Sequence, residues 1–153
     1  MRWRLHPWDA LTARQAYTVL QLRSAVFVLE QQCLYADMDG LDLQALHVLG
    51  YAGDALVAYA RCWQDEQNCA HIGRVVTASD ARGQGLGHDL MRQALVAVAS
   101  HWPGAPVLLG AQAHLAAFYA QHGFASNGPS YVEDGIPHIP MRRATPTREE
   151  TTC

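Results

Sequence analysis

The sequence predicts one α+β domain, in which a mixed and mostly antiparallel sheet of about six to seven strands is flanked by helices. Three observations lead to this prediction. The first half contains short alternating apolar runs separated by tight turns, which is typical of antiparallel strands. A glycine-rich segment then leads directly into a long amphipathic run. After it comes VLLGA at residues 107–111, a short and wholly apolar strand that fits the middle of a sheet.

Length and composition favour a single globular domain. The chain has 153 residues and is 50% hydrophobic, which is enough for a sizeable core. We assign residues 1–144 to this domain and expect residues 145–153, TPTREETTC, to be a disordered polar tail. The net charge of −3 provides no basic surface for nucleic acid. Without a membrane-length apolar run we expect a cytoplasmic protein, and without CxxC spacing we expect no metal site.

A long helix is predicted to follow a short first strand. The strand covers residues 3–6 and ends at Pro7. Thr12 can cap the helix with its hydroxyl, and Gln15 three residues later completes a capping box. Apolar residues continue at helical spacing, and the run AVFVL at residues 25–29 is apolar all round. We therefore expect the C-terminal end of this helix to be buried.

Residues 31–45 are predicted to form an acidic loop. Asp37, Asp39 and Asp42 surround Gly40, a composition that is found in calcium-binding loops. The glycine and glutamate that an EF-hand needs are not at the required positions, so we do not expect a calcium site. A solvated or helix-capping loop and a loop that attracts a cationic substrate both stay open.

Three antiparallel strands are predicted next. Residues 47–52 and 55–63 form a hairpin, because their side chains alternate and the Gly-Asp pair between them suits a tight turn. A second turn leads to a third strand at residues 71–77. The first half of the chain is therefore an antiparallel meander beside one long helix.

A glycine-rich loop follows the third of these strands and begins a second helix. Gly83, Gly85 and Gly87 stand directly before the amphipathic run HDLMRQALVAVAS. The first N–H groups of a helix lack intrahelical partners, and glycine removes the Cβ atoms that would keep a ligand from them. The segment therefore predicts an anion site, which we interpret as a site for the pyrophosphate of a coenzyme.

Two other phosphate-binding loops do not fit this segment. A P-loop requires a lysine, and the chain contains none. A Rossmann fingerprint requires GxGxxG behind the first strand of a βαβ unit, whereas this chain has GxGxG behind several antiparallel strands. Glycines that only allow a tight turn into a helix stay an alternative when the motif is taken alone.

The elements after the second helix are short. The apolar strand at residues 107–111 comes first. A third helix is expected at residues 114–122, where Gly123 ends it. Two strands, near residues 124–131 and 139–142, complete the predicted sheet.

Two motifs, in order, resemble the GNAT superfamily of acetyl-CoA-dependent N-acetyltransferases. The loop RGQGLG at residues 82–87 matches the family's R/Q-x-x-G-x-G/A signature. FYAQHGF at residues 118–124 matches its FYxxxGF element, and the strand at residues 107–111 lies between the two motifs. The resemblance implies the GNAT fold, in which a splayed pair of neighbouring strands holds the coenzyme.

Within the superfamily the chain is similar to the ElaA-like branch, and the likeness covers about residues 3–143. The segments that carry it are Leu22-Arg23, Val26-Phe27-Val28, Glu30-Gln31, Asp37-Met38-Asp39-Gly40, LGAQAH at residues 109–114 and EDGIPH at residues 133–138.

The resemblance implies that acetyl-CoA is the co-substrate. Backbone N–H groups of residues 83–88 would bind the pyrophosphate, and the strand at residues 75–77 would pair with the pantetheine arm. An N–H group near Val76 would polarise the acetyl carbonyl. Arg82 either adds a phosphate contact or lies in solvent. The implied coenzyme-binding residues are Val75, Val76, Thr77, Arg82, Gly83, Gln84, Gly85, Leu86, Gly87 and His88.

Two residues are candidates for proton transfer. Tyr119 stands where the family has a tyrosine that donates to the departing thiolate as general acid, although a core aromatic is the alternative. Glu30 is the candidate base, because burial at the end of the first helix would raise a carboxylate pKa toward the working range. His114, His138 or a chain of water molecules are alternatives, and Glu30 could instead bind backbone groups or Arg23.

We therefore expect an N-acetyltransferase that acts on an amine of a small molecule or a peptide by direct attack on acetyl-CoA. A non-catalytic module that senses acetyl-CoA is the main alternative, and an interaction domain that binds no coenzyme is a third. Tyr119 favours the enzyme, because a binding module needs no phenol beside the sulfur. The sequence does not identify the acceptor, and it leaves monomer and homodimer open.

Direct transfer makes one prediction about the cysteine nearest to the expected site. Nothing beside Cys33 in the sequence lowers a thiol pKa, so an acetyl-cysteine intermediate is not expected. Cys33→Ala should therefore leave turnover of acetyl-CoA with an amine acceptor intact in a thiol-release assay. A loss above roughly 100-fold, or about 2.7 kcal/mol of transition-state stabilisation, would overturn direct transfer.

Overall fold

The computed structural model describes residues 1–144, so the predicted polar tail at residues 145–153 lies outside the described residues. In the described part, one eight-stranded sheet has the strand order β1-β2-β3-β4-β5-β8-β6, and β7 pairs with β8. The strands are β1 (Arg2–Pro7), β2 (Leu46–Ala52), β3 (Ala55–Gln64), β4 (Ala70–Thr77), β5 (Val107–Gln112), β6 (Ala125–Ser126), β7 (Tyr131–Glu133) and β8 (Ile136–Arg143). Only β4 and β5 run parallel; the other neighbours are antiparallel, which confirms the predicted mixed α+β sheet.

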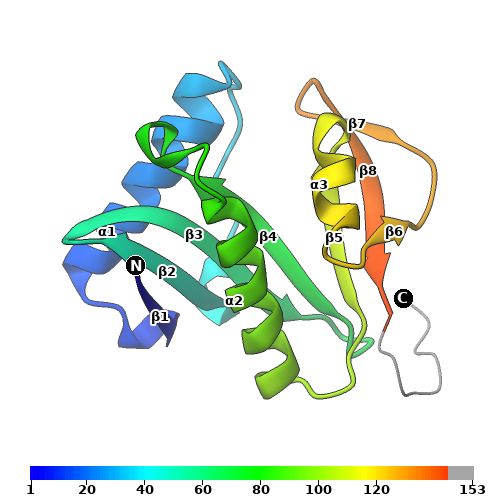
Figure 1. Ribbon diagram of the computed structural model, residues 1–153, viewed down its shortest axis with the longest axis horizontal. Coiled ribbons are helices and arrows are strands. Elements are labelled where there is room, and N and C mark those ends of the chain that lie inside the picture. The colour runs from blue at the N-terminus through cyan, green and yellow to red at the C-terminus, as the bar shows by residue number, and fades with distance from the viewer. Residues whose placement is uncertain (145–153) are drawn as a thin grey trace.

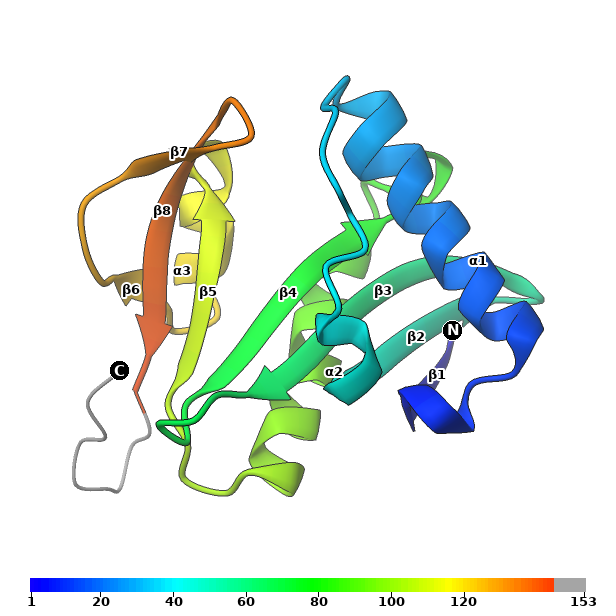
Figure 2. The same cartoon turned by 180° about the vertical axis from the view of Figure 1, so that it is seen from behind.

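Helices cover both faces of the sheet (Figures 1 and 2). The α-helices are α1 (Ala13–Arg23), α2 (Leu86–His101) and α3 (Ala116–Ala120), and a π-helical segment, η2 (Ser24–Glu30), continues α1. Short 3-10 turns are η1 (Trp8–Ala10), η3 (Leu41–Gln44), η4 (Ser79–Ala81) and η5 (Ala113–Leu115). On the α2 and α3 face, Leu90 and Tyr119 belong to the larger apolar cluster. On the α1 face, Val19 packs in a second cluster with Tyr59 and Val76.

The sheet separates into two halves between β4 and β5. These strands pair only at Ala70 with Val107 and at His71 with Leu108. Beyond that point β4 stays paired with β3 as far as Thr77, whereas β5 stays paired with β8. Figure 1 shows the two strands diverging from their shared end. The splayed strand pair that the family resemblance implied is therefore present.

The start of α1 agrees with the sequence prediction, but the end of this helical segment differs. Thr12 Oγ1 accepts from the Gln15 N–H at 3.0 Å, and Gln15 Oε1 accepts from the Thr12 N–H at 2.8 Å, which completes the capping box. After α1 the chain widens into η2, where hydrogen bonds such as Gln31 N–H to Val26 O span five residues. This wider turn changes which side chains face the sheet, and Leu29 is 70% exposed rather than buried.

The C-terminal elements are shorter than predicted. The strand expected at residues 124–131 is divided into β6 and β7 by a loop that contains Pro129, which lacks the N–H that a continuous ladder needs. The third helix has only one α-helical turn, α3, behind the 3-10 turn η5, and Gly123 follows it at φ +88°.

The packing of β1 on β2 makes a stability prediction. A Cβ atom added at Gly50 would stand 2.5 Å from Trp3 Cζ3, so the indole must move. We expect Gly50→Ala to lower the free energy of unfolding by about 1–3 kcal/mol in urea titrations. Gly73→Ala is the matched control, because its nearest neighbour would be Arg61 Nε at 4.0 Å. Equal losses in both variants would contradict this account of Gly50.

Candidate active site

A cavity of about 970 Å³ fills the space where β4 and β5 diverge, and we call it the cleft. The end of η2, the edge of β4, β5, α3 and the β7–β8 hairpin contribute to its lining. The predicted site residues that line it are Glu30, Val75, Val76, Thr77, Arg82, Gly87 and Tyr119. The predicted residues outside its lining are Gly83, Gln84, Gly85, Leu86 and His88.

The edge of β4 that faces the cleft is open. Val76 and Thr77 pair with Tyr59 and Ala58 of β3, and β5 pairs with β4 only at its first two residues. In a strand the N–H and C=O groups alternate between both edges, so residues 75–77 present polar backbone groups to the cleft. Such an edge can accept an extended chain as an additional strand.

The glycine loop has the geometry of an anion site. Gly83 and Gly85 have φ of +88° and +76°, and Cβ atoms added to them would meet nothing within 4 Å. Gly85 is the N-cap of α2, and no side chain caps its first N–H groups. These groups are therefore free to bind an anion at the positive end of the helix dipole. The side chain of His88 lies against α3, with its Nδ1 2.8 Å from His122 Nε2, so only the backbone N–H of His88 is a candidate for anion binding.

Arg82 and Glu30 form an ion pair at the mouth of the cleft. Arg82 Nη1 donates to Glu30 Oε2 at 2.6 Å, and Arg82 Nη2 donates to Glu30 Oε1 at 3.2 Å. Arg82 Nη2 also donates to the Thr77 carbonyl at 2.9 Å. Both side chains are 40% exposed, so the premise that Glu30 is buried was wrong. The glutamate lies on the widened turn of η2, which brings it outward to the arginine.

Tyr119 lies on α3 and is almost completely buried within the larger apolar cluster. Burial raises the pKa of its phenol to about 12, so the hydroxyl stays protonated throughout the physiological range. Within residues 1–144 this hydroxyl has no hydrogen-bond partner, although the side chain lines the cleft. The hydroxyl can therefore donate to a group that enters the cleft.

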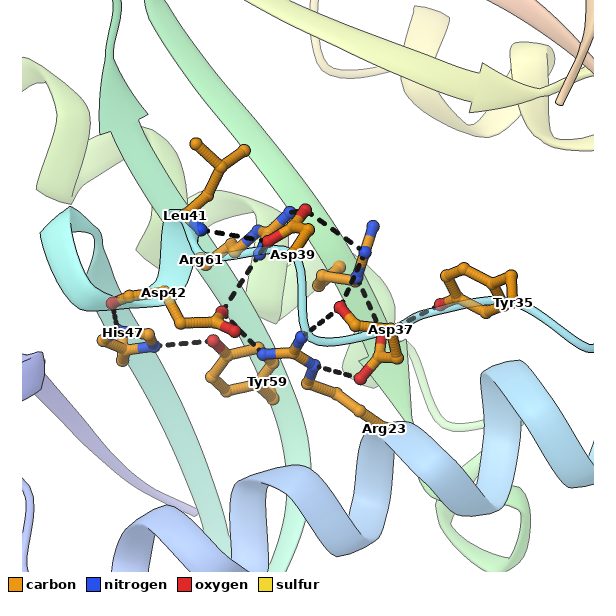
Figure 3. A network of polar contacts seen from close by, with 10 residues as sticks. Arg23, Tyr35, Asp37, Asp39, Leu41, Asp42, His47, Tyr59 and Arg61 are labelled. Carbon is orange, nitrogen blue, oxygen red and sulfur yellow. Dashed lines mark hydrogen bonds and ion pairs between the residues drawn. The ribbon is translucent and has the colours of Figure 1, made fainter. Parts of the chain in front are cut away.

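Arginines neutralise the three aspartates of the acidic loop (Figure 3). Arg23 of α1 is fully buried; its Nε donates to Asp37 at 2.9 Å and its Nη1 donates to Asp42 at 2.7 Å. Arg61 of β3 donates to Asp39 at 2.6 Å and to Asp42 at 3.0 Å. The three carboxylates are thus neutralised by arginines, although Asp39 lines the cleft and other residues of the loop, such as Leu34 and Met38, are exposed.

A third arginine connects this network to the wall of the cleft. The β3–β4 register shifts between Tyr59 and Arg61, which inserts one extra residue into β4 as a bulge. Arg74 lies in this bulge at φ +50°, a conformation that costs a non-glycine residue about 1–2 kcal/mol. Its Nε donates to Asp37 Oδ1 at 2.8 Å, and its Nη2 donates to the Asp37 carbonyl at 2.9 Å. These bonds hold the bulge in place.

Histidine and tyrosine complete the buried part of the network. The Asp42 carbonyl accepts from His47 Nε2 at 2.8 Å, so the Tyr59 hydroxyl donates to His47 Nδ1 at 2.6 Å. Burial lowers the pKa of His47, which keeps this ring neutral. Burial alone would raise the pKa of Asp42, but the hydrogen bonds and charges of Arg23 and Arg61 outweigh it and hold this pKa below its usual range.

Two core positions in the sequence carry the signal for this network. Arg23 falls on the apolar stripe of α1, and Arg61 lies in the alternating pattern of β3. A charged side chain at a core position requires a partner, and the aspartates of the acidic loop were the available acids.

Residues 1–144 hold no group of three or more His, Cys, Asp or Glu side chains that could bind a metal ion, and no helix among them is long and apolar enough to span a membrane.

Comparison with known proteins agrees with this geometry. The family model described as "Acetyltransferase (GNAT) domain" matches residues 13–145. The chain belongs to the GNAT acetyltransferase family. Protein ElaA of Escherichia coli strain K12 is 49% identical over 137 residues, which cover 87% of this chain and 90% of ElaA. The similarity to the ElaA-like branch is therefore confirmed.

Solved GNAT structures agree at two levels of similarity. A crystal structure of an acyl-CoA N-acyltransferase from Pseudomonas aeruginosa has a TM-score of 0.90 and 46% identity, and covers 94% of this chain and 99% of that one. An aminoglycoside 6'-N-acetyltransferase in complex with coenzyme A has a TM-score of 0.72 and 16% identity, with 96% and 99% coverage. At that identity the second likeness shows the shared GNAT fold alone.

The lowered pKa of Asp42 makes a prediction about stability and pH. Asp42→Asn leaves Arg23 and Arg61 without their shared charge, which should cost about 3–5 kcal/mol of unfolding free energy at pH 7. A carboxylate with a lowered folded pKa stabilises the fold above its unfolded pKa, about 3.9, and this contribution is lost as the pH falls through the folded pKa. Urea titrations should therefore show a smaller difference between the wild type and Asp42→Asn at pH 3 than at pH 7.

Asp54→Asn is the control, because Asp54 is exposed in the β2–β3 turn. An Asp42→Asn loss that equals the Asp54→Asn loss at pH 7, or that is the same at both pH values, would contradict the role of the network.

Proposed function

We propose that this protein is an N-acetyltransferase that binds acetyl-CoA in the cleft and transfers the acetyl group directly to an amine. The observation that carries the proposal is the position of Tyr119. Its phenol has no partner within residues 1–144 and lines the same cavity as the open edge of β4. A cavity that only bound the coenzyme would need the edge and the glycine loop, but not a hydrogen-bond donor for the sulfur.

The coenzyme is proposed to lie along β4 with its pyrophosphate on the glycine loop. N–H groups of residues 83–88 bind the pyrophosphate, and residues 75–77 pair with the pantetheine amides. The uncapped start of α2 and the open edge of β4 support this placement. The coenzyme A complex of the distant aminoglycoside acetyltransferase supports it at the level of the fold.

In the reaction the amine nitrogen attacks the thioester carbonyl carbon. A backbone N–H near Val76 stabilises the negative oxygen of the tetrahedral adduct. The C–S bond then breaks, and the departing sulfur accepts a hydrogen bond from Tyr119. Because burial raises the pKa of this phenol to about 12, its protonation does not limit the rate between pH 5 and 10.

The proposed roles of Arg82 and Glu30 are linked. The arginine now binds the glutamate through two hydrogen bonds, so a coenzyme phosphate that contacts Arg82 competes with Glu30. Binding of the coenzyme would then leave the Glu30 carboxylate with fewer partners, at the mouth of the cleft. Glu30 stays a candidate base only in that state.

Tyr119→Phe tests this proposal, because it keeps the ring and removes the donor. With acetyl-CoA and a panel of primary amines, release of free thiol by the wild type should depend on the amine. For the best acceptor we expect kcat to fall at least about 100-fold in Tyr119→Phe, while the Kd for acetyl-CoA stays within about threefold. Tyr17→Phe, a change at an exposed position of α1, is the matched control.

The alternatives give different results in the same assay. Tight binding of acetyl-CoA without thiol release for any amine would favour a coenzyme sensor. Failure of calorimetry to detect acetyl-CoA binding would refute both the enzyme and the sensor.

A further inference from the structure

We propose that His138 is the general base that accepts the proton of the acceptor amine, a role that rests on the proposed acetyltransferase function. His138 lies on β8, lines the cleft, and is only 9% exposed. One ring nitrogen, Nδ1, donates a hydrogen bond to a backbone carbonyl, and the other, Nε2, has no hydrogen-bond partner within residues 1–144. Four features of its position carry the inference.

The first feature is the face of the sheet on which His138 lies. Residue pairs across β5 and β8 place His138 opposite Gln112 and Met141 opposite Leu109. Leu109, Met141 and Tyr119 belong to the same apolar cluster on the α3 side. Because successive side chains alternate between faces, His138 points to the other face. The imidazole and the phenol of Tyr119 therefore line one cleft from opposite faces of the sheet.

The second feature is the tautomer of the ring. His138 Nδ1 lies 2.7 Å from the Ile136 carbonyl oxygen. A carbonyl can only accept, so we assign the ring proton to Nδ1, and Nε2 of the neutral ring carries a lone pair. Within residues 1–144, Nε2 makes no hydrogen bond and is not sealed from solvent. An anchored imidazole with a free lone pair in a cavity is the arrangement of a general base.

The third feature is the set of groups around the imidazole. The Tyr131 ring of β7 stacks on it, with centroids 5.5 Å apart. Glu133 Oε2, also on β7, lies 3.8 Å from Nε2, beyond hydrogen-bond distance. In the turn after β7, the Asp134 carbonyl accepts a hydrogen bond from Cys33 Sγ at 3.3 Å. His114 of η5 is a further ionisable group that lines the cleft.

The fourth feature is the difference from the other candidate bases. Glu30 is 40% exposed and holds Arg82 through two hydrogen bonds. His114 is exposed on a short turn, and no hydrogen bond to residues 1–144 anchors either of its ring nitrogens. Of Glu30, His114 and His138, His138 is the residue that is both buried and held by a hydrogen bond to backbone. A base that is held in one orientation loses less entropy when it meets the substrate.

The proton balance of the step is complete without another reactant. A protonated amine gives one proton to Nε2, and the freed nitrogen lone pair attacks the acetyl carbon. As the C–S bond breaks, its electron pair goes to sulfur, which takes the proton of the Tyr119 hydroxyl; the nitrogen then loses its second proton, which restores the phenol. One proton ends on the thiol of coenzyme A, and the other leaves from His138 to solvent.

The test uses two probe amines with acetyl-CoA and follows thiol release at pH 7. Phenylethylamine is protonated at this pH and needs the base, whereas hydroxylamine is largely neutral. His138→Asn keeps a donor near the Nδ1 position and removes Nε2. We expect this variant to lose at least about 100-fold with phenylethylamine and no more than about 10-fold with hydroxylamine. His138→Ala should show the same pattern, and added imidazole should restore part of its phenylethylamine rate.

Controls separate the base from structural effects. Both His138 variants should keep the melting temperature within a few degrees and the Kd for acetyl-CoA within about threefold. His101→Gln, at the far end of α2, should leave both rates unchanged. The role of His138 would be overturned by equal losses with both amines or by absence of rescue with imidazole. It would also be overturned if Glu30→Gln or His114→Gln, rather than the His138 variants, lost activity with phenylethylamine alone. Acetyl-CoA binding without wild-type turnover of either amine would refute the transferase and this role together.

Discussion

The carboxylate of Asp37, shared between Arg23 and Arg74, is the contact on which the shape of the cleft depends. Arg23, at the end of α1, is buried and donates to Asp37, and Arg74, in the left-handed bulge of β4, donates to the same carboxylate. The bulge lies where β4 has left β5 and stays paired only with β3. An isolated residue at φ +50° is unfavourable, so the ion pairs select this backbone over a regular strand. The network therefore links the packing of α1 to the wall on which a coenzyme would lie.

The same architecture separates two kinds of chemistry. Tyr119 reaches the cleft from the apolar α3 side, where burial keeps its phenol protonated. His138 reaches it from the opposite face, and its Nε2 lies 3.8 Å from Glu133 Oε2. The leaving thiol and the incoming amine would thus meet different groups. In this arrangement the cleft would hold a proton donor and a proton acceptor apart, on opposite faces of the sheet.

Local patterns predicted the parts of the fold that depend on local interactions. The capping box at Thr12, the turns of the hairpin and the glycines before α2 were readable because neighbouring residues determine them. The exposure of Glu30 was not, because the apolar run before it fits an α-helix and a π-helix equally well. The bulge at Arg74 was also missed, since its partner Asp37 stands 37 residues away in the sequence. Interactions across such distances leave no periodic signal in one chain.

Amide hydrogen exchange with and without acetyl-CoA tests most directly whether this cleft is the coenzyme site. We expect new protection at residues 75–77, where the open edge of β4 would gain a partner, and at residues 83–88 around the start of α2. Amides of β1 and β2, at the edge of the sheet away from the cleft, should exchange at the same rates with and without acetyl-CoA. Protection that appears elsewhere, or unchanged exchange in both segments at saturating acetyl-CoA, would contradict the account.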